Sequence, residues 1–600
     1  MTLMGRGRRD GRVRGRTGLG AIAGVLAAAA ALGVGQFVAG LTGADGSPVV
    51  AVGELQIDFT PPWLKNFAIA EFGSDDKLIL VSGILVILGI FAAVLGAAAT
   101  RRLWYGMAGL AVFAVVGLTA AATRPTANLG SLLPTLAATA AAAAVLRFLI
   151  PLARPAPLGG PATWIKAPWL DTWEPGETSR AKEGGGEPDE LPAAPDLPVA
   201  PDLPVAPDRP VAPDLPVAPD RPAGRGRAAE PEQPGERGEP GALEEAGPRR
   251  RSFLKASAVT VGIAAGAGLA GRLLAERSSV ASAQRALRIP KPASALTLPP
   301  GVNLDVPGIS PFITSNANFY RVDTAIVLPQ VDPSSWQLRI HGMVNREITL
   351  SFDELLKRPL IEDYVTLCCV SNPVAGPYIG NALWLGASLS SLLREAGIKA
   401  GADQLMCTSV DGFTSGTPVQ AVMDDKDALL AVAMNGTALP VAHGFPARMV
   451  VPGLYGYVSA TKWVTDIDVT TFAGNYAYWA QRGWSQQAPI KTECRIDVPS
   501  GSNQLKTGRT AIAGVAWAQH KGIDAVHVRV DQGPWNQATL AAVPGIDTWR
   551  QWVWEWEATG GNHVIEARAT DATGYTQTSF DAAPEPNGAS GYPMVSVAVA

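Results

Sequence analysis

Four long apolar runs dominate the first quarter of the chain. They cover residues 19–41, 78–99, 104–122 and 129–146, and they contain almost no charged side chains. Each run approaches the roughly 20 residues that an α-helix needs to cross the hydrocarbon core of a bilayer. A soluble helix bundle would instead carry polar stripes at helical spacing. The pattern therefore predicts an N-terminal all-α membrane bundle of four helices within residues 19–150.

Charged residues between the apolar runs predict the orientation of this bundle. Residues 1–18 contain a cluster of arginines, and Arg101 and Arg102 separate the second run from the third. Because cytoplasmic segments carry an excess of Lys and Arg, both segments are expected in the cytoplasm. The loop with Asp75 and Asp76 is then outside, and the chain returns to the cytoplasm after the fourth run.

A proline-rich linker follows over residues 151–248. Within it, "APDLPV" and its variants repeat in six-residue units from residue 194 to residue 223. Proline at every third position is incompatible with helix or sheet and favours an extended polyproline II conformation. The segment is predicted to be a disordered spacer; the alternative is a docking strip for a partner.

The stretch "RRRSFLKASAVTVGIAAGAGLAG" (249–271) resembles a twin-arginine export signal. Its apolar part is short and rich in Gly and Ala, and Ala281-Ser282-Ala283 has the small-x-small form of a cleavage site. A chain that has returned to the cytoplasm needs such a signal to export its C-terminal half. The alternative for residues 249–283 is an ordinary fifth membrane span. Twin-arginine transport carries folded proteins, often around a cofactor, so a cofactor-binding domain is expected next.

The hydrophobic pattern changes at about residue 300. Short β-branched and aromatic runs such as "WQLRIHGMV" and "ARMVVPG" alternate with brief helical ones, "FDELLKR" and "LSSLLREAG". This alternation predicts an α+β domain over residues 300–485. Over residues 489–600 strands recur at regular spacing between turn residues, which is typical of an immunoglobulin-like β-sandwich.

Composition excludes several kinds of function. A formal net charge of -4 gives no electrostatic reason to expect nucleic-acid binding. The chain has no GxSxG nucleophile motif, no CxxCH haem motif and no cysteine–histidine set at zinc-ligand spacing. What remains is the adjacent pair Cys368 and Cys369. Neighbouring strand residues point to opposite sides, so one thiol can be buried while the other faces a cleft.

The segments around this pair resemble the sulfite oxidase family of molybdopterin enzymes. The resemblance rests on the order of the motifs and covers about residues 300–600. The motifs are "NANFYRVDTAIVLPQVD" (316–332), "TLCCVSN" (366–372), "GNALWLGASLSSLL" (380–393), "DGFTSGTPV" (411–419), "LPVAHGFPARMVVPGLYGYVSATKWV" (439–464) and, similar to the family's immunoglobulin-like dimerisation domain, "AIAGVAWAQHKGIDAVHVRVDQGPW" (511–535).

The resemblance implies a molybdenum ion held by a pterin dithiolene and one protein cysteinate. The matching position is Cys369, while Cys368 occupies a variable position. A soft thiolate suits molybdenum, and coordination keeps it deprotonated. The expected cofactor is molybdenum-molybdopterin without an added nucleotide.

The pterin ends in a phosphate-bearing arm, for which the resemblance implies cationic partners. Arg448 offers a bidentate fork, Lys462 a point charge and His443 a ring donor. The other positions that match the cofactor pocket are Asn316, Tyr320, Arg321, Asn372 and Ser459.

Two departures from the family pattern concern the substrate. Phe413 stands where sulfite oxidases have a tyrosine beside the metal, and it has no hydroxyl to donate. The segment after Cys369 lacks the family's oxyanion-binding arginine, which leaves Arg321 as the expected cation beside the metal. Cys369, Arg321 and Phe413 are thus the predicted reaction-site residues, and sulfite itself is disfavoured.

The predicted activity is two-electron oxygen-atom transfer on a small-molecule substrate. It is either oxidation of a sulfur oxyanion or reduction of an S-oxide or N-oxide. The alternative is a non-catalytic membrane scaffold that retains the fold.

The same reasoning extends to location and partners. The four apolar runs contain no histidine and the chain has no haem motif, so no haem is expected and electrons should leave to, or arrive from, a separate electron-transfer protein. A multi-pass protein of the bacterial cell membrane with an extracytoplasmic catalytic domain is predicted. A homodimer through the C-terminal domain is expected, as in the family.

Overall fold

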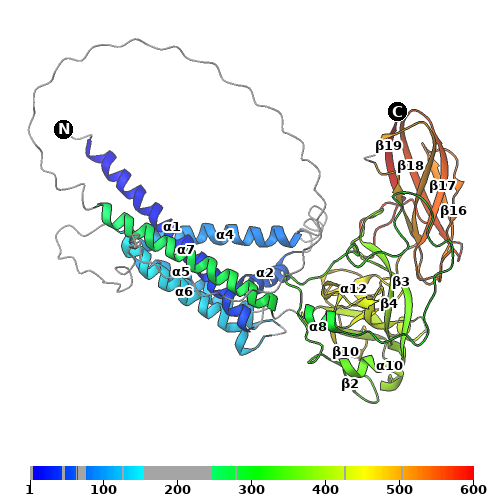
Figure 1. The fold of residues 1–600 in the computed structure, drawn as a ribbon, viewed down its shortest axis with the longest axis horizontal. Helices are drawn as coiled ribbons and strands as arrows, with labels where there is room; N and C mark the ends of the chain where they lie inside the picture. The colour runs from blue at the N-terminus through cyan, green and yellow to red at the C-terminus, as the bar shows by residue number, and fades with distance from the viewer. Residues whose placement is uncertain are drawn as a thin grey trace, which may run out of the picture. The chain divides into compact units, whose positions relative to one another are not determined.

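The computed structural model describes residues 4–42, 47–61, 64, 76–124, 127–154, 246–277, 280–424, 427–501 and 504–600. Figure 1 draws these residues as ribbons coloured along the chain. The proline-rich repeats and Asp75 lie outside the described residues, so the predictions made for them stay predictions.

The predicted apolar runs lie within long helices. Within the described residues, five helical stretches are long and apolar enough to cross a membrane: Thr17–Thr42, Ile79–Ala99, Leu103–Ala122, Leu129–Ala153 and Arg251–Leu274. They belong to α1 (Met4–Thr42), α4 (Asp76–Ala99), α5 (Leu103–Ala122), α6 (Leu129–Ala153) and α7 (Ala246–Arg277).

Two features of this region go beyond the sequence prediction. A further helix, α2 (Pro48–Phe59), begins with a proline in its first turn, where the missing N–H costs no hydrogen bond. The fourth apolar helix continues past the predicted end at residue 146 to Ala153, because a single arginine at 147 does not stop a helix.

Glycines let α1 and α4 pack closely. A methyl group added to Gly24 would collide with the backbone of Ala92, and one added to Gly96 would collide with the backbone of Gly24. Small residues at such contacts are typical of membrane helices, where packing rather than water exclusion drives association.

The α+β domain contains two sheets. One has the strand order β2-β1-β10-β5-β6, and the other has the order β3-β4-β7-β8, with β9 paired to β7. The strands are β1 (Gln337–Gly342), β2 (Ile348–Ser351), β3 (Leu360–Cys368), β4 (Ile379–Ser388), β5 (Gln404–Ser409), β6 (Thr414–Pro418), β7 (Leu429–Met434), β8 (Thr437–Ala438), β9 (Arg448–Val450) and β10 (Val464–Thr470).

Short helices precede, connect and follow these strands. They are α8 (Ala281–Ala286), α9 (Phe352–Leu356), α10 (Leu389–Ala396), α11 (Val419–Met423) and α12 (Gly456–Ser459), with 3₁₀ turns η3 (Val441–His443) and η4 (Ala480–Arg482). The two predicted helical segments are α9 and α10. Ser388 caps α10 by accepting a hydrogen bond from the Ser391 N–H, and Gly397 ends it in the left-handed conformation.

Two packed sheets form the C-terminal β-sandwich. Their strand orders are β11-β13-β17-β16 and β12-β19-β18-β14-β15. The strands are β11 (Glu493–Val498), β12 (Gln504–Leu505), β13 (Gly508–Trp517), β14 (Ile523–Val530), β15 (Asn536–Gln537), β16 (Thr539–Leu540), β17 (Arg550–Ala558), β18 (Gly561–Asp571) and β19 (Met594–Val599). Buried Ile512, Val526, Trp552 and Ile565 share its core. The predicted fold class is confirmed.

Buried hydrogen bonds join the sandwich to β3. The Trp549 N–H donates to Thr366 Oγ1 over 2.7 Å, and Gln519 Nε2 donates to the Thr366 carbonyl over 3.0 Å. Thr366 Oγ1 in turn donates to Asn381 Oδ1 on β4. The strand that leads to the cysteine pair is therefore held by both domains.

Candidate functional site

The two adjacent cysteines lie in different environments at the end of β3. Cys368 is fully buried in the core, whereas Cys369 is half-buried just beyond the strand. The Cys369 N–H donates to the Tyr378 carbonyl over 2.9 Å, and the Asn372 N–H donates to the Cys369 carbonyl over 3.1 Å. This is the contrast expected from strand alternation. Burial raises the pKa of both thiols, so in the absence of a metal both are protonated at neutral pH.

Asn372 supplies a buried donor next to this turn. Its Oδ1 accepts the Tyr378 N–H over 2.8 Å, but its Nδ2 is buried without a hydrogen-bond partner. An unsatisfied buried amide costs free energy unless a ligand or water accepts from it. Asn372 thus offers a donor to a bound group.

Tyr320 approaches the cysteines from the segment before β1. Burial raises the pKa of its phenol well above the usual value, and the neighbouring thiols Cys369 and Cys368 raise it further. Its ring stacks on Phe319 with the centroids 5.3 Å apart, and Phe319 meets His443 edge to face. The predicted pocket residues Tyr320 and His443 are therefore on one aromatic cluster.

His443 is neutral at pH 7. Burial, and then the charge of Arg448, lower its pKa to about 4. Its Nε2 lies 3.1 Å from the carbonyl oxygen of Asn316, which can only accept, so Nε2 carries the proton and Nδ1 does not. The predicted ring donor is therefore used within the protein, and Nδ1 is left as an acceptor.

Arg448 is a buried cation stacked 5.0 Å from the Trp384 ring centroid. Nη1 donates to the His443 carbonyl over 3.2 Å, and Nη2 donates to the Ala460 carbonyl over 3.1 Å. Burial lowers its pKa to about 10, which leaves it charged at neutral pH. The guanidinium thus holds two loops together as well as supplying positive charge.

Lys462 and Arg321 share one carboxylate, that of Asp323. Lys462 Nζ lies 2.7 Å from Asp323 Oδ2, and Arg321 Nε donates to the same oxygen over 2.8 Å. Burial lowers the pKa of Lys462 to about 8, while Asp323 opposes this shift. Sequence reasoning missed Asp323, although its position two residues after Arg321 on an extended segment was a usable signal.

Ser459 and Asn316 are bound to the protein itself. Ser459 Oγ donates to the carbonyls of Leu454 and Tyr455, over 2.9 and 3.2 Å, and closes the turn of α12. Asn316 Nδ2 donates to the Met434 carbonyl over 3.2 Å. Both side chains position backbone near the predicted pocket, and their cofactor roles stay predictions.

Phe413 lies in the turn between β5 and β6, against a segment that sequence reasoning left out. Its ring centroid is 5.8 Å from that of Tyr478, and the Arg482 guanidinium lies 3.6 Å from the Tyr478 centroid. Arg482 Nη1 also donates to the Tyr478 carbonyl over 2.8 Å. The run "YWAQRGW" (478–484) was the available signal. It adds a phenol and a cation beside Phe413.

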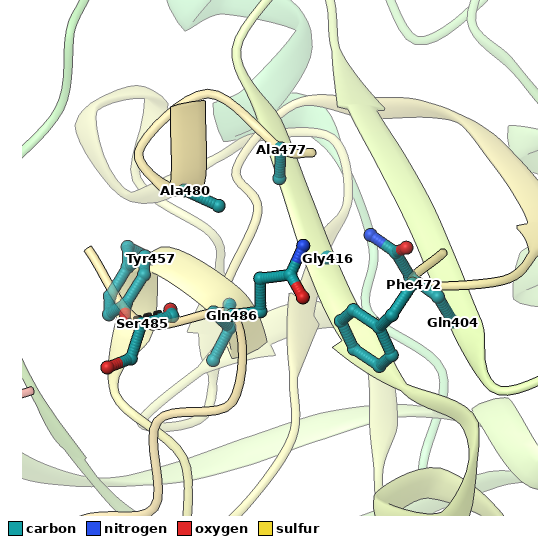
Figure 2. Close-up of a pocket in the computed structure, with 9 residues that line it drawn as sticks. Gln404, Gly416, Tyr457, Phe472, Ala477, Ala480, Ser485 and Gln486 are labelled. Carbon is teal, nitrogen blue, oxygen red and sulfur yellow. Dashed lines mark hydrogen bonds between the residues drawn. The ribbon is translucent and has the colours of Figure 1, made fainter. Parts of the chain in front are cut away.

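A small cavity of about 10 Å³ lies elsewhere in this domain, lined by Gly416 of β6, by Gln404, Tyr457, Phe472 and Gln486, and by four further residues. Figure 2 shows the Gln486 amide extending beside Gly416. Gln404 Oε1 and Gln486 Nε2 are buried without hydrogen-bond partners. An acceptor and a donor around this volume suit one water molecule. None of the predicted site residues lines this cavity.

The predicted site residues fit an anionic, hydrogen-bonding cofactor. Arg448 is a buried cation, Lys462 is a cation whose side chain is 11% exposed, and Asn372 has an unused buried donor. Gly444, at φ 108°, lies where an added methyl group would press on both cationic side chains. Among the described residues no group of three or more His, Cys, Asp and Glu could hold a metal ion, so a metal at Cys369 would need further ligands from a cofactor.

Comparisons with known proteins point in the same direction. Residues 325–479 match the oxidoreductase molybdopterin binding domain. The chain is 30% identical over 315 residues to sulfite oxidase from Gallus gallus, covering 44% of this chain and 67% of that protein. It is 28% identical over 290 residues to mitochondrial sulfite oxidase from Rattus norvegicus, covering 41% of this chain and 52% of that protein.

One further similarity is to a bacterial protein and another is to a solved structure. The uncharacterized oxidoreductase YuiH of Bacillus subtilis (strain 168) is 30% identical over 153 residues, which cover 26% of this chain and 74% of that protein. Among solved structures, the sulfane dehydrogenase SoxCD from Paracoccus pantotrophus aligns with a TM-score of 0.41 at 24% identity, over 48% of this chain and 81% of that chain.

Proposed function

Because this chain belongs to the sulfite oxidase family of molybdopterin-binding oxidoreductases, we propose that residues 300–600 catalyse two-electron oxygen-atom transfer on a small extracytoplasmic substrate. The observation that carries this proposal is the end of β3, where Cys368 is buried and the half-buried Cys369 interacts electrostatically with Lys462 and Tyr320. When bound, a molybdenum–pterin group supplies the exchange of one oxygen atom and two electrons with the substrate.

The chain's own residues bind and orient this group. Cys369 provides the thiolate ligand, and metal binding has to displace the proton that burial otherwise keeps on it. Arg448 and Lys462 bind the phosphate arm, and the unused Nδ2 of Asn372 donates a hydrogen bond. Neutral His443 accepts at Nδ1 while its Nε2–H fixes the ring on Asn316.

On the substrate side, the proposal that sulfite itself is disfavoured is supported by the residues around Phe413 and Arg321. Phe413 presents an apolar ring, and Arg321 forms an ion pair with Asp323. The proposal covers both oxidation of a sulfur oxyanion and reduction of an S-oxide or N-oxide.

The membrane part is proposed to anchor and orient the enzyme. Five long apolar helices support a multi-pass anchor. The arginine-rich N-terminus and Arg101–Arg102 favour a cytoplasmic location for these segments, and the paired arginines before α7 favour twin-arginine export of the catalytic half. A separate protein is proposed to exchange electrons with the catalytic domain, and the sandwich is proposed to form a homodimer.

Cofactor retention tests the role of Arg448. Arg448→Ala should weaken pterin binding roughly 10- to 150-fold, because a charge-assisted contact to a buried phosphate contributes about 1.5–3 kcal/mol. The measurement is molybdenum and pterin content per chain after dialysis of the purified protein. Arg339→Ala, which removes an exposed arginine of the same domain, should retain full content. Undiminished content in Arg448→Ala would remove Arg448 from the phosphate site.

A further inference from the structure

Asp323 is the feature of the pocket that neither the predicted cofactor chemistry nor the family pattern explains. Its side chain is only 4% exposed and lies between two cations, Arg321 (37% exposed) and Lys462 (11% exposed). Arg321 donates through both Nε and Nη2, over 2.8 and 3.2 Å, and Lys462 Nζ is 2.7 Å away. One carboxylate therefore holds both cations at once.

These contacts determine how much positive charge is left for a substrate. Arg321 and Arg448 each repel Lys462 electrostatically, and burial, and then all three cations, lower the pKa of His443, which is neutral. With Asp323 the group has three positive charges and one negative charge. A phosphate monoester carries about two negative charges at neutral pH, so the phosphate of the cofactor arm balances the remaining net positive charge of this group. A doubly negative substrate would then find no uncompensated cation in this group.

Releasing Arg321 to bind an oxyanion would be costly. The ion pair with Asp323 is bidentate and almost removed from water on the carboxylate side. Breaking such a pair leaves a buried carboxylate without a full set of partners, which is strongly unfavourable. Arg321 has five N–H groups, and those not used by Asp323 can still donate to a single neutral oxide oxygen.

We propose, on the basis of the proposed function, that Asp323 selects substrates by their charge. It holds Arg321 and Lys462 in ion pairs, so that the pocket accepts an uncharged S-oxide or N-oxide in preference to a sulfur oxyanion. Asp323 acts through the two cations and is a positioning residue. The corresponding reaction balances when one S-oxide, two protons and two electrons, one from each of two reduced one-electron carriers, yield one thioether and one water. Phe413, which has no hydroxyl, suits the same uncharged substrate.

The test uses the purified full-length enzyme in detergent, with sulfate as an unreactive oxyanion probe. Asp323→Asn should bind sulfate at least about tenfold more tightly than the wild type, measured by equilibrium dialysis. The same variant should raise KM for dimethyl sulfoxide, with reduced viologen as donor, more than it lowers kcat. Asp323→Glu, which keeps the charge, should behave as the wild type.

Two controls separate this effect from general changes. Glu347→Gln removes an exposed carboxylate from the same domain and should leave sulfate binding unchanged. Arg482→Ala removes the cation beside Phe413. Added to Asp323→Asn, it should leave the sulfate binding that Asp323→Asn has gained.

A measurement on the wild type keeps the inference testable even where Asp323→Asn fails to fold. Sulfate should raise the wild-type KM for dimethyl sulfoxide less than about twofold. The sulfate concentration is the one that saturates Asp323→Asn or, where that variant does not fold, about 10 mM. Strong competition by sulfate in the wild type, or unchanged sulfate affinity in a folded Asp323→Asn that retains molybdenum, would overturn the role of Asp323. Absence of molybdenum from the wild type would instead overturn the proposed function.

Discussion

Replacing Cys369 by serine is expected to abolish oxygen-atom transfer and to eliminate or reshape the molybdenum(V) EPR signal. A hydroxyl is a hard and weakly acidic ligand that does not replace a thiolate on a soft metal site. Cys369 is half-buried and just beyond β3, where its side chain is accessible to a cofactor. Turnover with an artificial electron carrier and EPR of the partly reduced enzyme measure the two effects.

Cys368→Ser is the matched control. Cys368 is fully buried, and the change removes a small hydrophobic group from the core, which costs about 1 kcal/mol of stability. This variant should therefore keep its activity and its EPR signal while its thermal midpoint falls by a few degrees, as roughly 1 kcal/mol implies for a domain of this size. If Cys368→Ser proves inactive and Cys369→Ser active, the assignment of the metal ligand is wrong by one residue.

Replacing Arg250 and Arg251 by lysine is expected to leave the catalytic half on the cytoplasmic side. The change preserves positive charge, so an ordinary membrane span would still insert in the same orientation. A twin-arginine signal should fail, because its receptor distinguishes paired guanidinium groups from ammonium groups. α7 contains a 24-residue apolar stretch, Arg251–Leu274, which suits either role by length and composition.

Protease added to cells with the outer face exposed measures the outcome. It should reach residues 300–600 in the wild type and spare them in the double lysine variant. The same replacement at Arg101 and Arg102, in the loop between α4 and α5, is the control and should leave export intact. Equal accessibility of residues 300–600 in the wild type and in the variant at Arg250 and Arg251 would favour a plain fifth span. A shorter catalytic fragment in the wild type would show cleavage at Ala281-Ser282-Ala283.

Local patterns in the sequence predicted most of the fold. The apolar runs correspond to membrane-length helices, and the alternating segments after residue 489 correspond to strands of the sandwich. Both signals are local, because helix and strand periodicity depends on the spacing of apolar residues that are close together in the sequence. The different burial of Cys368 and Cys369 was predictable for the same reason.

Contacts between distant segments were not predictable in this way. Lys462 and Asp323 are 139 residues apart, and Thr366 and Trp549 are 183 apart. Phe413 meets Tyr478 from a segment beyond β10. No local pattern specifies such pairs, since they depend on how the two sheets and the sandwich pack.

Local competition also changed what individual predicted residues do. Ser459 uses its hydroxyl on the carbonyls of its own helical turn, as serines in short helices commonly do. Arg448 directs its N–H groups to the backbone carbonyls of two loops. Residue type alone therefore indicated positive charge at this place but not the direction of its hydrogen bonds.

Metal and pterin analysis of the purified, folded wild-type protein tests the central claim most directly. The claim is that Cys369 and the surrounding donors and cations form a working molybdenum–pterin site. We expect about one molybdenum and one pterin per chain, in keeping with a single cysteinate per site. A folded protein that contains neither, even when produced in cells supplied with molybdate, would contradict the account and leave a non-catalytic scaffold.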